Sequence, residues 1–244
     1  MKENPYDDPI FFEAYGRMPR SAEGLSAAGE WQALQALLPD FAGKRVLDIG
    51  CGYGWHCRHA AQNGAAFVLG LDLSERMLEV AREKTDLPNV EYRRMAMEDA
   101  DFPPDSFDAV LSSLALHYTP DFRLICERVR QCLTPGGSFV FSVEHPIFTA
   151  HGPQEWWYDS DHNRCHWPVD RYFEEGRREA RFLGQTVVKY HKTLSTYVNA
   201  LLQTGFSLTG FIEPQPAPNL LDTVPEMRDE LRRPMMLILS ATRG

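Results

Sequence analysis

The fold is decided by the stretch Val46-Leu47-Asp48-Ile49-Gly50-Cys51-Gly52-Tyr53-Gly54. Its first residues predict a buried β-strand, and the glycines follow where a helix should begin. Glycine lets a ligand approach the backbone closely, and the unpaired N–H groups at a helix start favour a negative group. The stretch therefore predicts a ligand-binding loop between a strand and a helix.

Two details of this stretch distinguish it from the loop that binds dinucleotides. The acid Asp48 lies on the strand, two residues before the first glycine. The glycine spacing is G-x-G-x-G, whereas dinucleotide sites use G-x-G-x-x-G. A carboxylate at this point suits a ligand with an ammonium group better than one with a pyrophosphate.

On both sides of this stretch, short apolar runs alternate with helix-like segments up to about Val143. This alternation is typical of a parallel α/β sheet, and the apolar strands indicate helices on both faces. We expect strands at Arg45–Ile49, Phe67–Leu71, Val90–Arg94, Asp108–Ser112 and Ser138–Val143, the last entered through Pro135-Gly136-Gly137. We expect helices at Trp55–Gln62, from a cap at Ser74 to about Glu83, and at Phe122–Cys132.

A second acid, Asp72, follows the second predicted strand, about twenty residues after the glycines. An acid at this distance accepts hydrogen bonds from both ribose hydroxyls of a bound nucleoside. The alternative role, a helix cap, is already filled by Ser74. The sequence therefore predicts that Asp72 binds ribose.

These motifs, in this order, resemble the class I S-adenosylmethionine (SAM)-dependent methyltransferases. The resemblance covers roughly residues 40 to 145 and is carried by Val46–Gly54, Asp72, Phe107-Asp108-Ala109-Val110 and Leu133-Thr134-Pro135-Gly136-Gly137. Within this class, the sequence is similar to small-molecule enzymes such as the ubiquinone and menaquinone biosynthesis methyltransferases. It implies a Rossmann-like, doubly wound seven-stranded α/β sheet, mostly parallel with an antiparallel C-terminal hairpin. Phe206–Ile212 and Met235–Ser240 would supply that hairpin, after a helix capped by Thr193.

The resemblance also implies a set of cofactor-binding residues, with SAM as the cofactor. The amino-acid end of SAM would lie against Asp48, Gly50, Cys51 and Gly52, the ribose on Asp72, and the adenine between Leu73 and Met77. The usual Gly-Asp-Ala after the third strand is Met95-Ala96-Met97 here, so Met97 and either Glu98 or Asp99 would meet the adenine amine. Ser113 and two residues of the N-terminal arm, Tyr15 and Arg20, complete the expected set.

Three residues are candidates for catalysis, because each follows a strand at the carboxyl edge where α/β sheets bind ligands. His117 follows the fourth strand and is the natural general base, since its ordinary pKa lies near neutrality. Glu144 and His145 follow the fifth strand. The alternatives are a His117 that only packs its loop and a turn that is simply fixed by Pro146.

The segment from Phe148 to Lys192 departs from the family pattern and contains aromatic residues interspersed with arginines. Such residues would cover a planar or anionic acceptor, and we expect Tyr118, Trp157, Tyr172 and Arg177 to bind it. A structural flap or a dimer contact is the alternative. A hairpin is expected around Gly184-Gln185. His162, Cys165 and His166 have no third or fourth metal ligand nearby, so no metal is expected.

Length and composition favour one methyltransferase domain over residues 1–244. We divide it into a cofactor-covering arm (1–40), a SAM-binding core (41–147), a substrate-side insertion (148–192) and a C-terminal helix and hairpin (193–244). The net charge of −9 opposes a nucleic-acid partner. No apolar run spans a membrane, and the acidic start is unlike a signal peptide, so we expect a cytoplasmic protein.

The sequence thus predicts a SAM-dependent methyltransferase for a small-molecule acceptor. Two alternatives remain at this point: a non-catalytic SAM-binding or interaction protein, which the cofactor motifs do not exclude, and an NAD-dependent oxidoreductase, which the glycine spacing opposes. Neither the acceptor nor the oligomeric state follows from these residues.

Overall fold

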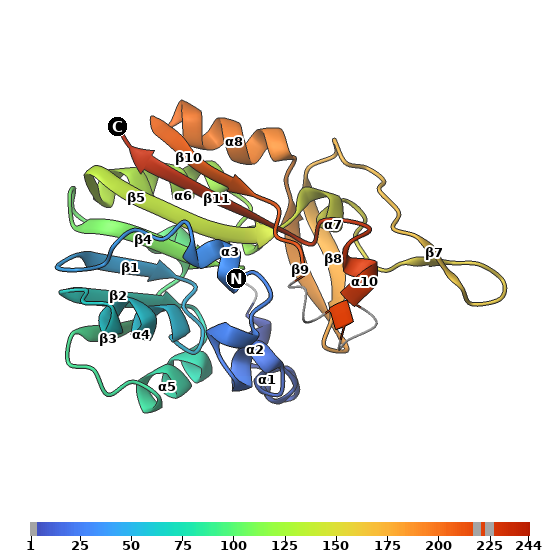
Figure 1. Cartoon of the computed structure of the whole chain (residues 1–244), viewed down its shortest axis with the longest axis horizontal. Coiled ribbons are helices and arrows are strands. Elements are labelled where there is room, and N and C mark those ends of the chain that lie inside the picture. The colour runs from blue at the N-terminus through green and yellow to red at the C-terminus, as the bar shows by residue number, and fades with distance from the viewer. Residues whose placement is uncertain (1–3, 217–220, 223–226) are drawn as a thin grey trace.

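A seven-stranded sheet forms the centre of the computed structural model, which describes residues 4–216, 221–222 and 227–244 (Figure 1). Strands β1 to β5 are parallel, and β11 is antiparallel to both β5 and β10. The order across the sheet is β10 (Phe206–Ile212), β11 (Met236–Arg243), β5 (Leu133–Glu144), β4 (Phe107–Ser113), β1 (Arg45–Ile49), β2 (Phe67–Asp72) and β3 (Val90–Arg94). The expected Rossmann-like fold, including its C-terminal hairpin, is confirmed.

Helices cover both faces of this sheet because successive side chains of each strand point to opposite sides. Leu47 packs in a core with α6 (Phe122–Cys132) and α8 (Leu194–Gln203). Its neighbour Val46 packs in a second core, with residues of α3 (Trp31–Gln35), α4 (Trp55–Gln62) and α5 (Glu75–Glu83). The near-continuous apolar character of the strands thus reflects burial on both faces.

The two expected helix caps are present. The Ser74 hydroxyl accepts a hydrogen bond from the Met77 N–H at 3.2 Å, and the Thr193 hydroxyl accepts one from the Thr196 N–H at 3.2 Å. Each cap satisfies an N–H that the helix itself leaves unpaired. The Ser74 cap fixes the start of α5 directly behind Asp72.

Strand β5 begins at Leu133, whereas the sequence predicted a start at Ser138 after a Pro-Gly-Gly turn. Leu133 already pairs with Phe107 of β4, and the register shifts before Ser138 pairs with Ala109. Gly136 lies within this irregular stretch and has a φ of 77°, which favours glycine. The Pro-Gly-Gly segment is therefore an irregularity within the strand.

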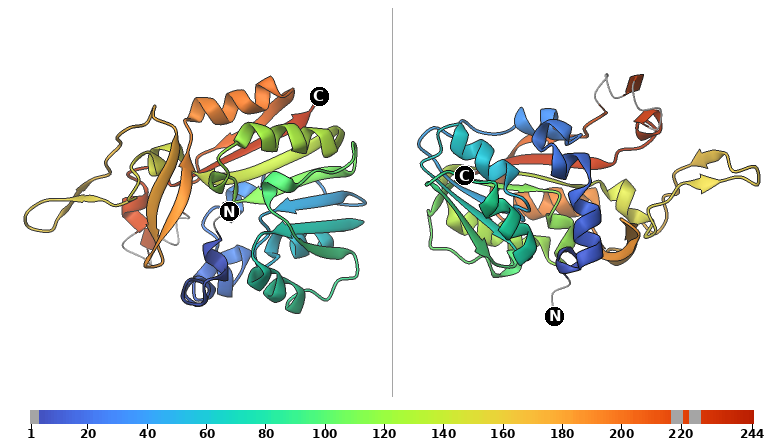
Figure 2. Two further views of the ribbon diagram at one scale, coloured as in Figure 1. Left: turned by 180° about the vertical axis from the view of Figure 1, so that it is seen from behind. Right: turned by 90° about the horizontal axis from the view of Figure 1, so that it is seen from below.

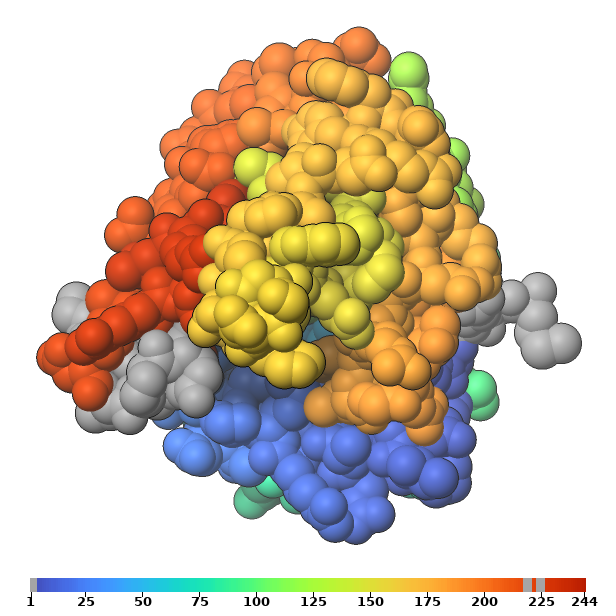
Figure 3. Space-filling model, turned by 90° about the vertical axis from the view of Figure 1, so that its right-hand side faces the viewer, coloured from blue at the N-terminus to red at the C-terminus, as the bar shows by residue number. Residues whose placement is uncertain are grey.

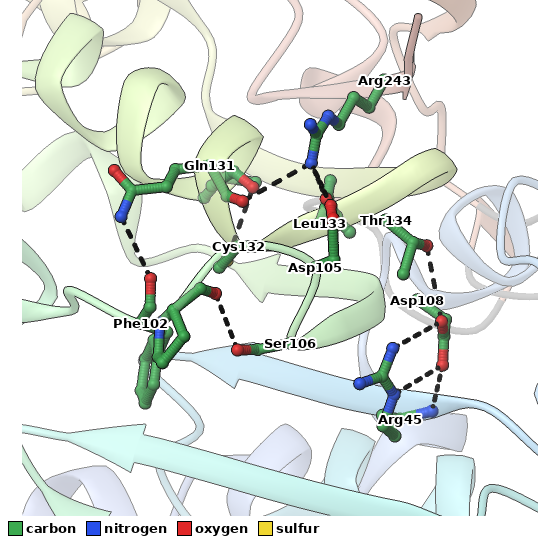
Figure 4. A network of polar contacts seen from close by, with 12 residues as sticks. Arg45, Phe102, Asp105, Ser106, Asp108, Gln131, Cys132, Leu133, Thr134 and Arg243 are labelled. Carbon is green, nitrogen blue, oxygen red and sulfur yellow. Dashed lines mark hydrogen bonds and ion pairs between the residues drawn. The ribbon is translucent and has the colours of Figure 1, made fainter.

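Polar contacts tie the strands together at the end of the sheet where β1 and β4 begin (Figure 4). The Arg45 guanidinium contacts Asp108 at 3.1 Å, and Thr134 donates to the same carboxylate at 3.4 Å. Arg243 of β11 pairs with Asp105 at 2.7 Å. This network lies away from the carboxyl ends of β1 to β5, which are left to face the N-terminal arm and the insertion.

The remaining elements gather beyond those carboxyl ends (Figures 1 and 2). The N-terminal arm contains η1 (Pro5–Asp7), α1 (Pro9–Gly16), α2 (Pro19–Ala22) and η2 (Leu25–Ala27). Two short turns, η3 (Met97–Asp99) and η4 (Leu116–Tyr118), follow β3 and β4. The insertion contains α7 (Pro146–Ala150), β6 (Trp157–Tyr158), β7 (Arg164–His166), β8 (Gly176–Phe182) and β9 (Gln185–His191), and α10 (Met227–Glu230) lies beside it.

Strands β8 and β9 form the hairpin that the sequence predicted around Gly184-Gln185, with Phe182 paired to Gln185. The β6–β7 hairpin extends away from the rest of the molecule (Figure 1). In the described part of the chain, no helix has the length and apolar character needed to cross a membrane.

Candidate functional site

The glycine loop after β1 is held in a conformation that requires glycine. Gly50, Gly52 and Gly54 have φ values of 76°, 52° and 71°. A Cβ atom on Gly50 would lie 2.4 Å from the Cβ of Ala115, so no side chain fits there. The Gly50 N–H donates to the carbonyl of Leu71 at 2.8 Å. The loop is thereby packed against β2 and the segment after β4.

Asp72, at the end of β2, is held by two backbone N–H groups. Gly52 donates to Oδ2 at 2.8 Å, and Ser74 donates to Oδ1 at 2.9 Å. Burial raises the pKa of Asp72, and these hydrogen bonds oppose that effect. Each carboxylate oxygen keeps a lone pair, so the group can accept two further hydrogen bonds from a ligand.

A cavity of about 920 Å³ opens at the carboxyl edge of the sheet and contains most of the predicted cofactor residues. Its volume lies near the top of the range of about 300–1,000 Å³ that is typical of ligand pockets. The predicted residues in its lining are Tyr15, Arg20, Gly50, Gly52, Asp72, Leu73, Met77, Met97, Glu98 and Ser113. Residues from four separate strand ends therefore meet around one space, as expected for an open α/β sheet.

Asp48 and Cys51 lie behind the glycine loop, outside the cavity lining. Asp48 is only 1% exposed, and the Cys57 thiol donates to its Oδ2 at 3.3 Å. Burial raises the pKa of Asp48 to about 7. The direct contact that we expected between Asp48 and a ligand ammonium is thus replaced by a contact with Cys57, and Asp48 supports the loop from behind.

Glu30 is a site-forming residue that the sequence analysis missed. Arg20 donates to its Oε1 at 2.9 Å, and the Ser113 hydroxyl donates to the same atom at 3.2 Å. Glu30 is 1% exposed, which fixes both cavity-lining partners in place. An acid directly before a short helix ordinarily indicates an exposed position, so nothing in the local sequence marks Glu30 as buried.

The N-terminal arm covers the cavity and is bonded to the elements on either side of it. The Tyr6 hydroxyl lies 3.1 Å from that of Tyr118, and Gln185 of the β8–β9 hairpin donates to Asp8 at 2.9 Å. The Ser74 hydroxyl donates to Asp7 at 2.5 Å. Figure 3 shows the arm (blue) against the insertion (yellow to orange) at this end of the molecule. The arm therefore closes one wall of the site.

A buried polar cluster forms the end of the cavity next to the insertion. Lys189 of β9 donates to Glu144 Oε1 at 2.5 Å and to Gln154 Oε1 at 3.0 Å, and Gln154 donates to Glu144 Oε2 at 2.7 Å. Burial by itself would raise the pKa of Glu144, but the Lys189 ammonium outweighs it, so that pKa is lowered. Glu144 and Lys189 therefore form a buried ion pair.

Comparison with known proteins identifies the family to which this arrangement belongs. Residues 47–141 match the family model described as a methyltransferase domain. The S-adenosylmethionine dependent methyltransferase from Mesorhizobium loti is 46% identical, with a TM-score of 0.84 over 90% of this chain and 100% of that one. The chain belongs to the SAM-dependent methyltransferases. A Listeria monocytogenes protein assigned to the same class is 56% identical, with a TM-score of 0.87 over 91% of this chain and 99% of that one.

One further relative of this methyltransferase matches over the core. The ubiquinone biosynthesis O-methyltransferase of Neisseria meningitidis serogroup A is 37% identical over 130 residues. The alignment covers 48% of the present chain and 55% of that enzyme. The family indicated by the sequence is therefore confirmed.

The cofactor of this methyltransferase is SAM, and the residues around the cavity fit it. The lone pairs of Asp72 suit the two ribose hydroxyls, and Leu73 and Met77 provide apolar contact for a base. Gly50 and Gly52 contribute bare backbone to the cavity lining. Of the two acids that we expected near the adenine amine, Glu98 lines the cavity and Asp99 does not.

Four residues that we expected at the acceptor or in catalysis lie away from the methyltransferase cavity. His145 accepts from the Ile147 N–H at 3.0 Å and contacts Glu213 at 2.8 Å, so it caps α7. Tyr172 accepts from the Leu194 N–H at 3.1 Å, and Arg177 pairs with Glu179 at 2.7 Å. Trp157 is 60% exposed on the outer hairpin. Tyr118 does line the cavity, as do Arg181, Phe182 and Lys189 of the β8–β9 hairpin.

His117 lines the methyltransferase cavity as expected, but its ring is oriented as a donor. The Glu144 N–H donates to His117 Nδ1 at 3.3 Å, so the neutral ring carries its proton on Nε2. Burial lowers the pKa of His117 to about 4. Glu144 opposes this shift, and the cations Lys189, Lys192 and Arg20 reinforce it. This environment favours a hydrogen-bond donor over a general base.

We therefore expect His117 to stay neutral at physiological pH, with a bare Nδ1. In an NMR titration of ¹⁵N-histidine-labelled protein, its midpoint should lie near 4, well below the ordinary value of about 6.5. The resonance that disappears in His117→Gln assigns the signal. A midpoint between 6 and 7, or a protonated Nδ1 at pH 7, would restore the general-base hypothesis.

Proposed function

We propose that this methyltransferase transfers the SAM methyl group in line to a small-molecule acceptor bound between the β8–β9 hairpin and the ends of β4 and β5. SAM supplies a methyl group activated by its positive sulfur. The observation that carries the proposal is the continuity of the cavity, which extends from Asp72 to Lys189 and is closed by the arm. Such a space holds two reactants in one orientation, which is the main requirement of a displacement reaction.

The protein groups at the acceptor end support binding and orientation. Glu144 and Gln154 hold the Lys189 ammonium, which leaves it one hydrogen for a ligand, and His117 offers its Nε2–H. Phe148, Phe182 and other apolar side chains line the walls and exclude water. We assign Tyr118 to the acceptor as well, because its hydroxyl lies at the boundary with the arm.

The cofactor assignment is tested with Asp72→Ala. Loss of the ribose acceptor should weaken binding of SAM and its demethylated product S-adenosylhomocysteine (SAH) by about 1–3 kcal/mol, measured by calorimetry. Asp86→Ala removes an exposed acid outside the cavity and should leave the affinity unchanged. In the wild type, both ligands should raise the melting temperature and NAD should not. Unaltered SAH affinity in Asp72→Ala would remove Asp72 from the site.

A further inference from the structure

Among the residues that the structure describes, none at the acceptor end of the cavity is placed to remove a proton. Of the described residues that line this end, His117 and Glu144 are the ones with basic side-chain atoms of suitable chemistry. His117 Nδ1 already accepts the Glu144 N–H, and its Nε2 carries a proton. Each oxygen of Glu144 accepts one hydrogen bond, from Lys189 or from Gln154, and the Lys189 ammonium makes the remaining lone pairs of this carboxylate poor proton acceptors. The lowered pKa values of both groups agree with this geometry.

Hydrogen-bond donors, in contrast, remain available at the same place. The described partners of Lys189 take two of its three ammonium hydrogens, and His117 Nε2–H has no partner in the described residues. Arg181, which is exposed and lines the cavity, also lacks an ion-pair partner among them. Among the described residues that line this end, the one carboxylate is Glu144, which is already paired with Lys189. An anionic ligand thus finds donors here, whereas a cationic amine finds no unpaired acid.

The walls around these donors are apolar. Phe148, Phe182, Val187, Met235 and Met236 all line the cavity near the insertion. Apolar walls stabilise the uncharged part of a ligand by burial, and they strengthen its contacts with the few polar groups. The site therefore suits a molecule with one anionic end and a hydrophobic body.

We propose that the acceptor is a hydrophobic carboxylic acid, bound as its carboxylate by Lys189 and His117, and that the product is its methyl ester. This proposal rests on the methyltransferase function proposed above and specifies its substrate class. A carboxylate is ionised at neutral pH, so its oxygen can attack without a general base. A hydroxyl or ammonium acceptor would first have to lose a proton to a group that the site does not offer.

The proposed step balances without a further reactant. A carboxylate oxygen forms a bond to the methyl carbon as the bond between that carbon and sulfur breaks, and the electron pair of the broken bond stays on sulfur. The carboxylate and the sulfonium lose their opposite charges together, which gives a neutral ester and the thioether SAH. No proton moves and no atom is oxidised or reduced, so this chemistry needs only positioning.

The test compares acids with uncharged molecules of the same skeleton. The probes are phenylacetate, 4-phenylbutyrate, octanoate and decanoate, each with its primary amide and its alcohol. Calorimetry on the SAH-loaded full chain at neutral pH should show at least one acid that binds tenfold or more tightly than both neutral partners. Failure of every acid to bind more tightly than its amide would overturn the proposal.

The double variant Lys189→Met/Glu144→Gln removes the ammonium without leaving a buried carboxylate unpaired. The preference for the acid should fall at least tenfold in this variant, while SAH affinity stays within about twofold. Arg123→Ala, which removes an exposed cation on α6, is the matched control and should leave the preference intact. An unchanged preference in the double variant would contradict the role of Lys189.

Turnover with methyl-labelled SAM identifies the bond that is made. A methyl ester releases labelled methanol in alkali, whereas a methyl ether or methylamine does not. Alkali-stable label on an alcohol or amine would overturn the carboxylate proposal and leave the methyltransferase function standing. If the proposed methyltransferase function itself were wrong, the result would be different: the wild-type protein would bind neither SAM nor SAH.

Discussion

Replacement of Gly50 with alanine should abolish most SAM binding, with an affinity loss on the order of a hundredfold or more, or about 3 kcal/mol. The new Cβ would lie 2.4 Å from the Cβ of Ala115, far inside contact distance. A positive φ adds about 1–2 kcal/mol of strain for a residue with a side chain. The loop must then move, and Gly52, which donates to Asp72, moves with it. Calorimetry with SAH measures the loss.

Two further variants separate the steric clash from the backbone strain. Gly136 has a similar φ of 77°, lies outside the cavity and has no atom within 4 Å of an added Cβ. Gly136→Ala should therefore lower stability without changing SAH affinity. Ala115→Gly, combined with Gly50→Ala, removes the clash and should recover part of the binding. Equal SAH affinity in Gly50→Ala and wild type would show that the loop does not form the site.

Lys189→Met should destabilise the folded protein by about 3–5 kcal/mol, because it leaves the buried Glu144 carboxylate without its cation. The two side chains are 3% and 16% exposed, so water screens neither well. The double variant Lys189→Met/Glu144→Gln should recover most of this loss, since no charge remains buried. Denaturant unfolding of the wild type, both single variants and the double variant gives the coupling energy.

An exposed pair provides the control for this cycle. Arg123 and Glu127 on α6 are 61% and 51% exposed, so Arg123→Met should cost less than about 1 kcal/mol. Additive losses at Lys189 and Glu144 would mean that the two groups do not interact. In that case the acceptor end of the cavity would lack the ion pair on which its chemistry depends.

The elements of the core could be predicted from the sequence because local patterns and tertiary packing agree there. The bounds expected for Arg45–Ile49, Trp55–Gln62 and Phe122–Cys132 are those of the structure. β5 departs most from its expected bounds, since a Pro-Gly-Gly segment ordinarily indicates a turn, whereas pairing with β4 continues the strand through it. The early start of β5 depends on its pairing with β4, which lies elsewhere in the chain, and the local sequence pattern does not encode this pairing.

The cofactor end was predicted better than the acceptor end for a related reason. The distance between Asp72 and the glycines is set within one strand–helix–strand unit, so the spacing is informative. The directions of the side chains in the insertion depend on how the β8–β9 hairpin packs against the core, which the local sequence does not specify. On β8, Arg177 and Arg181 share a residue type and a face of the strand, yet Arg181 lines the cavity and Arg177 pairs with Glu179. Lys189 and Glu30 gave no local signal of burial.

Two parts of the chain line the cavity, namely the sheet core and the β8–β9 hairpin. Core residues such as Gly50 and Asp72 line the end of the cavity that we propose for SAM, the methyl donor that the members of this family share. The hairpin residues Phe182 and Val187 line the end of the cavity that we propose for the acceptor. Because the sheet folds around its own core, the hairpin can accumulate substitutions while use of the methyl donor persists. A lineage of this fold can thus acquire a new acceptor by drift in one short segment of its gene.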